Sequence, residues 1–402
     1  MRISSNTLFD SNVAALTQQQ SRLVQTQQQI ASGRRLTSAA ADPVAATRAL
    51  DLTQADAIIT QQTANRVAAR DPVSLAESTL QSVTLLVQDA KTAAIYAGNG
   101  SLNASDRATL ATDLNGRLQE LIGLANTTDA SGNYLFSGFQ SKTTPFVATP
   151  AGMGYFGDDG QRLMQVSAGR QIPTSDSGAD VFMRIKNGNG SFVTQVNPAT
   201  PNAGSGVISA GSVLNPAALT GNDYNISFNI ANGATTYSVT NTTTGLPVTG
   251  QTAQTYVSGQ AIAFDGLQFD IQGAPVSGDS FTVTPSTNVS LFKTLSDLVS
   301  ALNAPVVGSN LTNALHTGMN NLDNALGTIL NTRANLGLRL NEIDALQLTG
   351  ENMGLQLKQS LAALQDTNVT QAISDLTQQQ TTLQAAQKSF AQISNLSLFT
   401  YI

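Results

Sequence analysis

Several residue types that carry chemistry are absent or scarce in this chain of 402 residues. It has no cysteine, no tryptophan and one histidine, His316. Without cysteine there can be no disulfide, thiolate metal site or cysteine nucleophile. One histidine excludes a multi-histidine metal cluster and makes a Ser-His-Asp triad dependent on His316. Aromatic residues amount to 5%, which argues against a stacking platform for single-stranded nucleic acid.

Charge is also scarce. Charged residues make up 11% of the chain, with 20 basic and 26 acidic side chains and a net charge of -6. A protein that binds a phosphate backbone needs a basic face, so we expect no nucleic-acid partner. Hydrophobic residues reach 41%, which is enough for a sizeable core.

A secretory or membrane-spanning segment is missing as well. The opening residues, MRISSNTLFDSNV, lack the basic cluster and apolar stretch of a signal peptide. No apolar run reaches the roughly 18 residues that a membrane span requires, so we expect no membrane insertion. The chain is expected to be cytoplasmic, or to leave the cell by a route that needs no such signal.

Glycine, proline and glutamate divide the chain near residues 141 and 287. The middle holds 19 of 32 glycines and 9 of 12 prolines, whereas all four glutamates lie outside it. Glycine and proline favour turns, and the leucine, alanine and glutamine of the outer parts favour helices. We predict an α+β fold in which an antiparallel β domain is inserted between N- and C-terminal helical arms.

Two hairpins are predicted in the middle part. Apolar and polar residues alternate before the turn pair Asn232-Gly233, and a second alternating stretch surrounds Asp265-Gly266. Asn-Gly and Asp-Gly are the strongest short-range signals for a hairpin. A last strand is expected around Phe281 and Val283.

The two ends of the chain carry helices with heptad spacing. The N-terminal helix, expected over about 11–31, should end at Gly33, and Asp42-Pro43 should begin the next helix. Glutamines interrupt both apolar stripes, and polar seam residues fix register at a cost in stability. We predict that the two helices are partners whose seam is completed by other subunits. The seam residues are Val13, Leu16, Leu23, Ile30, Val369, Leu376, Leu383, Phe390 and Ile393.

Helices between these ends continue the same spacing. Asp71-Pro72 should kink or interrupt one of them, and Ser105 should cap the next. The stretch 322–364 reads equally well as coiled coil or as the core of an ordinary helical bundle. Within it, Gly350 and Gly354 could allow close helix approach, but we favour a hinge because the heptad phase slips just beyond them.

Motifs for catalysis or ligand binding are weak. Gly152-Met-Gly-Tyr-Phe-Gly157 matches a dinucleotide pattern, but Asp158-Asp159-Gly160 would place carboxylates where phosphates should lie. The same acidic pair lacks the alternating ligands of a calcium loop and is expected to be a surface turn. His316 is expected on the solvent side of its helix. We predict no catalytic, cofactor-binding or metal-binding residues.

Taken together, these patterns predict three domains. Residues 1–42 with 365–402 should form a terminal coiled coil, 43–140 with 288–364 a helical bundle, and 141–287 the inserted β domain.

Short motifs distributed in order along the chain resemble the flagellin superfamily. The N-terminal half contributes MRISSN, IASGRRL followed by Ala41-Asp42-Pro43, and NYLFSGF followed by Thr144-Pro145-Phe146. The C-terminal half contributes SLFKTLSDLVSAL at 290–302, TRANLGLRLNE at 332–342 and the Leu-Ser-Leu-Phe ending at 396–399. The match is good in the arms and loose in the middle.

The resemblance implies a structural subunit of the extracellular axis of the bacterial flagellum, lying between hook and filament. It implies terminal helices that pair as an inner coiled coil, and a β domain that faces outward. Export would use the flagellum-specific type III apparatus and its gate, with a dedicated cytoplasmic chaperone. Implied partners are further copies of the chain in a helical layer, the first hook-associated protein and flagellin.

Two structural alternatives stay open at this point. The chain could be a flagellin that builds the filament itself, although the MRISSN opening favours the junction. It could also be a secreted coiled-coil adhesin or fibre, whose terminal helices would already be oligomeric in purified protein. An enzyme is disfavoured because no acid-base pair or cofactor site is visible.

Overall fold

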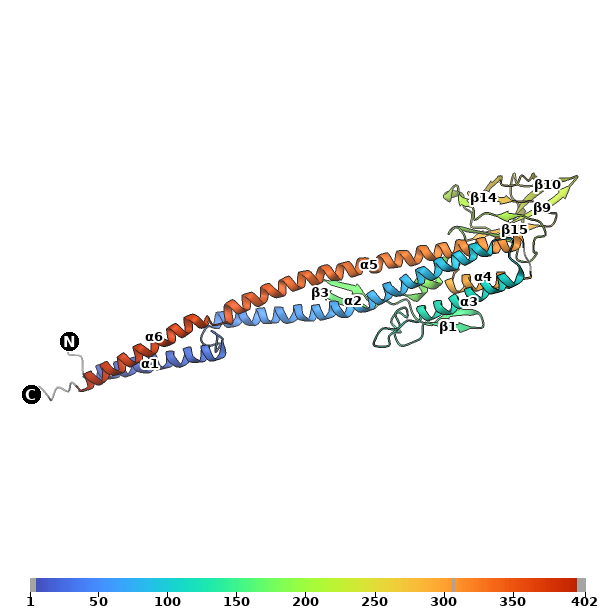
Figure 1. Ribbon diagram of the computed structural model, residues 1–402. Helices are drawn as coiled ribbons and strands as arrows, with labels where there is room; N and C mark the ends of the chain where they lie inside the picture. The colour runs from blue at the N-terminus through green and yellow to red at the C-terminus, as the bar shows by residue number, and fades with distance from the viewer. Residues whose placement is uncertain (1–4, 306–307, 396–402) are drawn as a thin grey trace, which may run out of the picture. The chain divides into compact units, whose positions relative to one another are not determined.

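The computed structural model describes residues 5–305 and 308–395, without the side chains of Ser5, Asn6, Leu8 and 393–395 (Figure 1). The chain forms two compact units. The first contains both ends of the chain, up to Asn65 and from Ala345, and the second spans Arg66–Asp344. Helices α2 (Pro43–Ala97) and α5 (Ser309–Gln365) contribute residues to both.

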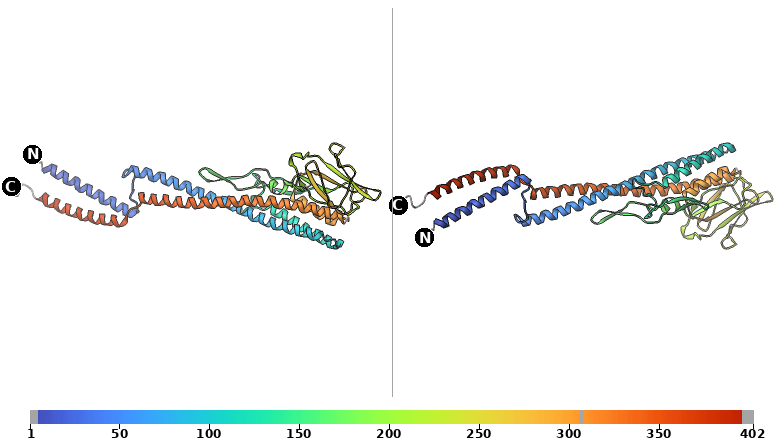
Figure 2. Two further views of the ribbon diagram at one scale, coloured as in Figure 1. Left: turned by 90° about the horizontal axis from the view of Figure 1, so that it is seen from above. Right: turned by 90° about the horizontal axis from the view of Figure 1, so that it is seen from below.

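In the first unit, α1 (Ser5–Ser32) lies alongside α6 (Val369–Asn395), as Figure 2 also shows. Helix α1 ends before Gly33, whose φ of +68° only glycine adopts without strain. Helix α2 begins at Pro43, and the Asp42 side chain accepts the Ala45 amide at 3.0 Å. Both predicted helix boundaries are therefore confirmed.

The loop after α1 is bound to the break between α5 and α6. The Arg35 amide donates to the Gln365 carbonyl at 2.6 Å, and the Thr367 amide donates to the Gly33 carbonyl at 2.9 Å. These bonds satisfy carbonyl and amide groups that a helix end leaves free. The predicted slip in heptad phase thus coincides with the interruption between helices α5 and α6 at residues 366–368.

The second unit has a helical part in which α2 and α5 pack with α3 (Ala104–Ala125) and α4 (Leu291–Asn303). Buried residues of α2 recur at spacings of three and four, and all four helices contribute to one apolar core. Leu80, Val83, Val87, Ala90 and Ala94, expected from the sequence as an apolar stripe, are all buried.

The expected interruption of a helix at Pro72 is absent, and the expected N-cap of α3 is wrong. Helix α2 continues through Pro72, because the neighbouring Ala69 and Val73 are fully buried and the packing outweighs the lost hydrogen bond. A kink at Pro72 stays a prediction. The N-cap of α3 is Asn103, not Ser105. Asn103 accepts the Asp106 amide and Asp106 accepts the Asn103 amide, which is a reciprocal capping box. Ser105 lies two residues later, inside the first turn of the helix.

The strands form antiparallel sheets, two of them large. One follows the order β11-β10-β9-β15-β6 with β12 also on β10, and the other the order β13-β14-β7 with β8 on β14. The pairs β1-β2, β3-β4 and β16-β5 are separate. A short π-helix, Ala179–Met183, and a 3-10 turn, Pro216–Ala218, complete the unit. The strands are β1 Phe146–Thr149, β2 Gly152–Tyr155, β3 Leu163–Ser167, β4 Arg170–Pro173, β5 Ile185–Lys186, β6 Phe192–Val196, β7 Val207–Ile208, β8 Ser212–Val213, β9 Tyr224–Ala231, β10 Ala234–Asn241, β11 Leu246–Pro247, β12 Gln254–Thr255, β13 Ala261–Phe264, β14 Leu267–Gln272, β15 Ser280–Pro285 and β16 Asn288–Val289.

Both predicted hairpins are present. Asn232 and Gly233 join β9 to β10 with φ of 53° and 78°, and Asp265 and Gly266 join β13 to β14 with φ of 45° and 80°. Positive φ at both turn residues is what a tight hairpin requires. The two large sheets enclose an apolar core separate from that of the helices. The predicted α+β fold is confirmed.

Candidate assembly surface

Helices α1 and α6 contact each other along their apolar stripes. The rings of Phe9 and Phe390 lie 5.2 Å apart, and the Thr26 hydroxyl donates to the Gln379 side-chain oxygen at 3.1 Å. The sequence placed Gln379 in the seam, and the structure shows it bonded across the pair. Thr26 was missed because a threonine beside glutamines carries no distinctive sequence signal.

The seam residues that are described lie on α1 and α6, and none of them is fully buried. Val13 and Val369 are 39% and 47% exposed. The side chain of Ile393 lies outside the described residues. Half-buried seam residues are Leu16, Leu23, Ile30, Leu376, Leu383 and Phe390. A coiled coil complete in itself would bury such positions.

Apolar side chains outside the seam are exposed on the same two helices. Phe9 is 51% exposed, Val24 49% and Ile373 51%. Between α1 and α6, a cavity of about 330 Å³ opens beside Leu16 and Phe390. The pair is thus loosely packed and leaves apolar area in water, which is typical of a surface that receives a partner.

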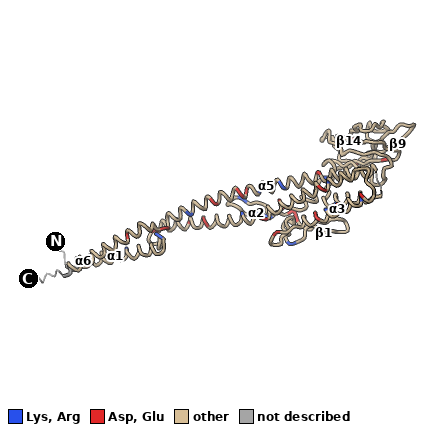
Figure 3. Tube along the Cα trace, in the orientation of Figure 1, with Lys and Arg blue, Asp and Glu red and all other residues tan. Residues whose placement is uncertain are grey.

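Few charges lie near this surface. Asp10 and Arg22 are the charged residues of α1, and Asp375 and Lys388 are those of α6, as the sparse colouring of these helices shows (Figure 3). Packing against further helices would therefore bury few charges, and the cost of removing charges from water would be small. We call the exposed apolar faces of α1 and α6 the assembly surface.

Gly350 and Gly354 lie within α5, which continues through both. Gly354 is buried, and a Cβ placed on it would lie 3.7 Å from the Ile59 side chain. That distance is an ordinary van der Waals contact, so the packing of α5 against α2 at this point would accommodate alanine. The hinge at these residues stays a prediction.

In the second unit, arginines bind the β3-β4 hairpin and the adjoining loop to α2 and α5. Arg339 pairs with Asp176 through two bonds of 2.8 Å, and these side chains are 17% and 13% exposed. The buried Arg66 donates to the Val166 carbonyl at 2.9 Å. Sequence reasoning did not find these contacts, because partners so far apart in the chain meet only in the fold.

Glu342 takes part in the same attachment. Arg170 on β4 donates to both oxygens of the Glu342 carboxylate, with one contact at 2.8 Å. The hydrogen bond and charge of Arg170 hold the pKa of Glu342 below its ordinary value.

The β domain is attached to α5 through asparagine side chains. Asn310 exchanges hydrogen bonds with the backbone of Asn202, and Asn313 accepts the Ile208 amide at 2.9 Å. Asn321 accepts the Gly188 amide at 3.0 Å. Most of the bonded partners are backbone groups of loops, so these contacts position the domain without depending on loop side chains.

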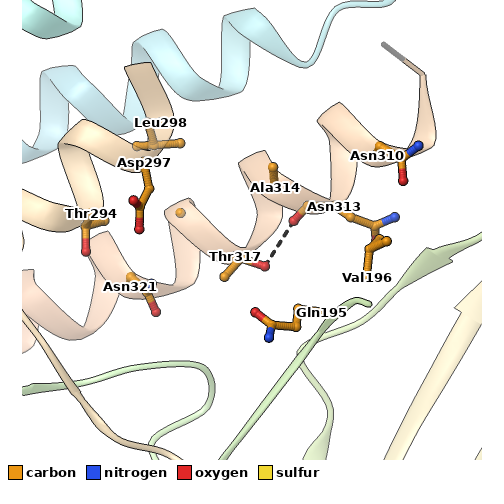
Figure 4. Close-up of a pocket in the computed structure, with 11 residues that line it drawn as sticks. Gln195, Val196, Thr294, Asp297, Leu298, Asn310, Asn313, Ala314, Thr317 and Asn321 are labelled. Carbon is orange, nitrogen blue, oxygen red and sulfur yellow. Dashed lines mark hydrogen bonds between the residues drawn. The ribbon is translucent and has the colours of Figure 1, made fainter. Parts of the chain in front are cut away.

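A polar cavity of about 230 Å³ lies beside these contacts, between α4, α5 and β6 (Figure 4). Asn321 and Thr294 line it from the helices, and Gln195 lines it from the strand. Its polar walls suit ordered water. We assign it no ligand.

The weak chemistry motifs have structural roles. Gly152 and Gly154 lie on strand β2, not on a loop before a helix. Asp158 accepts the amide of Gly160 two residues later and that of Phe139 on another loop, both at 2.8 Å. Asp159 pairs with Arg184, which holds the pKa of Asp159 below its ordinary value. Asp159 is exposed, as expected of a surface turn, whereas Asp158 is half-buried against the loop that contains Phe139.

His316 is exposed on α5, as expected. Within residues 5–305 and 308–395, no group of three or more His, Cys, Asp or Glu could hold a metal ion. No helix in that described part is both long and apolar enough to cross a bilayer.

Two families match parts of the chain. Residues 3–141 match the bacterial flagellin N-terminal helical region. Residues 198–285 match the D2-like domain of flagellar hook-associated protein 1.

Full-length relatives agree with these matches. Flagellar hook-associated protein 3 of Salmonella typhimurium is 29% identical over 404 residues, which cover 99% of each chain. A crystal structure of flagellar hook-associated protein 3 from Legionella pneumophila is 33% identical, with a TM-score of 0.72 over 78% of this chain and 98% of that one. The flagellar junction protein FlgL from Legionella pneumophila is also 33% identical, with a TM-score of 0.70 over 80% of this chain and 100% of that one. The chain belongs to the family of flagellar hook-associated protein 3, the flagellar junction proteins.

Proposed function

We propose that this chain is a structural subunit that joins the hook of the bacterial flagellum to the filament, and that it assembles through its terminal helices. The observation that carries the assembly step is the incomplete burial of the assembly surface on α1 and α6. A seam completed only by neighbouring subunits makes the folding of the chain ends part of assembly. The seam residues proposed to act there are those predicted from the sequence.

The proposed partners follow from the family. Further copies of this chain would form a layer, with the first hook-associated protein on one side and flagellin on the other. We propose that the chain is made in the cytoplasm, is held there by a dedicated chaperone and reaches the extracellular flagellum through the type III export gate. The absence of cysteine suits a chain that threads a narrow pore without cross-linking.

The proposed domain arrangement has three parts, with boundaries at 42/43, 140/141, 287/288 and 364/365. The separate apolar core of the two large sheets supports an independently folded part over about 192–283, whereas Phe146, Phe182 and Ile185 of the proposed insert belong to the core of the helices. The break between α5 and α6 supports the boundary near 365. We assign the chain no catalytic role, because the relatives are named as flagellar hook-associated and junction proteins.

The test replaces Leu383 by aspartate in the native bacterium and compares it with Gln384→Asp. Leu383 is half-buried in the α1–α6 pair and Gln384 is exposed one residue later, so both variants add the same charge on the same helix. Leu383→Asp should be exported but shed into the medium, with lost motility. Gln384→Asp should assemble and swim. Normal motility of Leu383→Asp would contradict assembly through this seam.

A filament subunit is the second candidate function, because residues 3–141 match the flagellin N-terminal region. Antibody labelling of intact flagella separates the two functions. One band at the base of each filament is expected for the junction, whereas label along the whole filament would establish a flagellin.

A further inference from the structure

The apolar core shared by α2 and α5 repeats along each helix. On α2, buried residues recur at spacings of three and four from Ala69 to Ala97. On α5, buried residues recur at spacings of three, four or seven, at Leu322, Ala325, Ile329, Leu336 and Ile343. If one helix slides past the other by one heptad, apolar residues meet apolar residues again. Such a core by itself selects one register only weakly.

A polar series follows the edge of this core on α2. It occupies one heptad position at residues 70, 77, 84 and 91, as Arg70, Glu77, Thr84 and Lys91. Each member contacts α5. Arg70 pairs with Asp344 at 3.2 Å and Lys91 pairs with Asp323. The two central members share one partner, described next.

Arg333 of α5 lies between Glu77 and Thr84. Its Nε and Nη2 donate to the Glu77 carboxylate at 3.1 and 2.7 Å, and its Nη1 lies 3.5 Å from the Thr84 hydroxyl. The side chains of Arg333 and Glu77 are 23% and 28% exposed, less than those of the Arg70–Asp344 pair. Arg333 is therefore the most enclosed contact of the series.

We propose that Arg333 is a positioning residue that sets the register of α2 against α5. In the native register it meets a carboxylate and a hydroxyl. A slide of one heptad in one direction would place it between Thr84 and Lys91, and a slide in the other direction would place it between Arg70 and Glu77. Either slide brings a second cation beside Arg333, and the first also removes its carboxylate.

The native register is favoured through the difference in free energy between it and the shifted registers. A partly exposed ion pair contributes little to stability by itself. The preference for the native register also depends on how unfavourable the shifted registers are, and here like charges repel each other in the shifted registers. The Lys91–Asp323 and Arg70–Asp344 pairs are lost in the same slides. The order of the series, with the acidic Glu77 and the neutral Thr84 between the cations Arg70 and Lys91, thus opposes slippage that the apolar core tolerates.

The test measures register directly in the full chain. Because the chain has no native cysteine, cysteines introduced at the exposed Ser78 and Asn341 can carry spin labels, and pulsed electron resonance gives the distance between them. One heptad of slide displaces one helix by about 10 Å along its axis. The labelled but otherwise unchanged chain should give one narrow distance distribution.

Two variants remove the selection in different ways. Arg333→Gln removes the cation, and the double variant Arg333→Glu with Glu77→Arg restores an ion pair but places attractive cations at 70, 77 and 91. Both should show a second distance population beside the native one, and the double variant should unfold at nearly the original temperature. A single native distance in either variant would overturn the proposal. In the double variant, that result would mean that any ion pair between positions 77 and 333 is enough to keep the native register.

Arg117→Glu is the matched control. Arg117 on α3 pairs with Asp89 and Asp113 at 3.0 Å, and neither of these partners belongs to the polar series at 70, 77, 84 and 91. Its charge reversal should lower the unfolding temperature while leaving one distance population. A second population in this control would mean that loss of stability alone produces slippage, and would also overturn the proposal.

Discussion

Thr26 on α1 and Gln379 on α6 form a hydrogen bond of 3.1 Å although 353 residues separate them in the chain. It is a polar contact between two stripes of mainly apolar residues that glutamines interrupt. Thr26 also donates toward the Arg22 carbonyl at 3.0 Å, so its hydroxyl keeps a partner if Gln379 is changed. Replacement of Gln379 therefore measures how a polar residue in the seam affects the stability of the α1–α6 pair.

Gln379→Leu should strengthen the α1–α6 pair in the purified monomer, because an apolar side chain replaces a polar one and Thr26 stays satisfied. Amide exchange in 7–32 and 369–392 should become slower. Gln378→Leu, at an exposed position of α6, is the control and should leave exchange unchanged. Faster exchange in Gln379→Leu would mean that the hydrogen bond stabilises the pair more than apolar contact does.

The unmodified monomer should show fast amide exchange at both ends and slow exchange in the second unit. The reason is that seam residues are half-buried in α1 and α6, whereas the core of the second unit is fully buried. Hydrogen exchange with mass spectrometry measures this directly. Slow exchange at both ends would indicate a preformed coiled coil, as in an adhesin or fibre.

Removal of the two large sheets, residues 192–285 of the β domain, should leave the helical part folded. The Ser286 amide donates to the Ser191 carbonyl at 2.9 Å, so deletion of 192–285 can join Ser191 to Ser286 without spanning a gap. Circular dichroism should retain the helical signal and a cooperative transition. Deletion of 370–402 should abolish assembly instead. Loss of the helical signal in the first deletion would show that the two cores depend on each other.

Arg339→Ala should lower the free energy of unfolding by about 3 kcal/mol, because it leaves the poorly exposed Asp176 carboxylate without its two bonds. Chemical denaturation measures this loss. Arg339→Lys should recover little of it, since an ammonium group cannot reproduce the paired geometry. Arg184→Ala, which breaks more exposed pairs with Asp159 and Asp180, should cost far less. Equal losses in the two alanine variants would contradict the special role of the Arg339 pair.

Acid should weaken the attachment of the hairpin β3-β4. The pKa of Glu342 is lowered in the folded chain from its ordinary 4.5. The carboxylate therefore stabilises the fold above pH 4.5, and this contribution disappears as the pH falls through the lowered value. The difference in unfolding temperature between the original chain and Arg170→Gln should shrink over this window. A difference that is constant from pH 7 to about pH 3 would show that the pair does not titrate as described.

The sequence by itself determined the helical arms, the β insert and the turns, because these depend on local chemistry. Asn232-Gly233 specifies its hairpin through positive φ, and Gly33 ends α1 for the same reason. Heptad spacing placed the seam residues on α1 and α6. Motifs such as TRANLGLRLNE added the flagellin resemblance, which the comparisons extend to a family.

Only the tertiary structure decided which residues meet across the chain. Pro72 stays inside α2 because packing around Ala69 and Val73 outweighs a local preference. The N-cap Asn103 is a different case, because its reciprocal bonds with Asp106 follow a local Asn-x-x-Asp pattern that the sequence itself contains. Arg333 meets Glu77 because α2 and α5 pack side by side, and Arg339 meets Asp176 because the loop after β4 lies against α5. Contacts of this kind depend on register and approach, and a single sequence encodes them only through the complete fold.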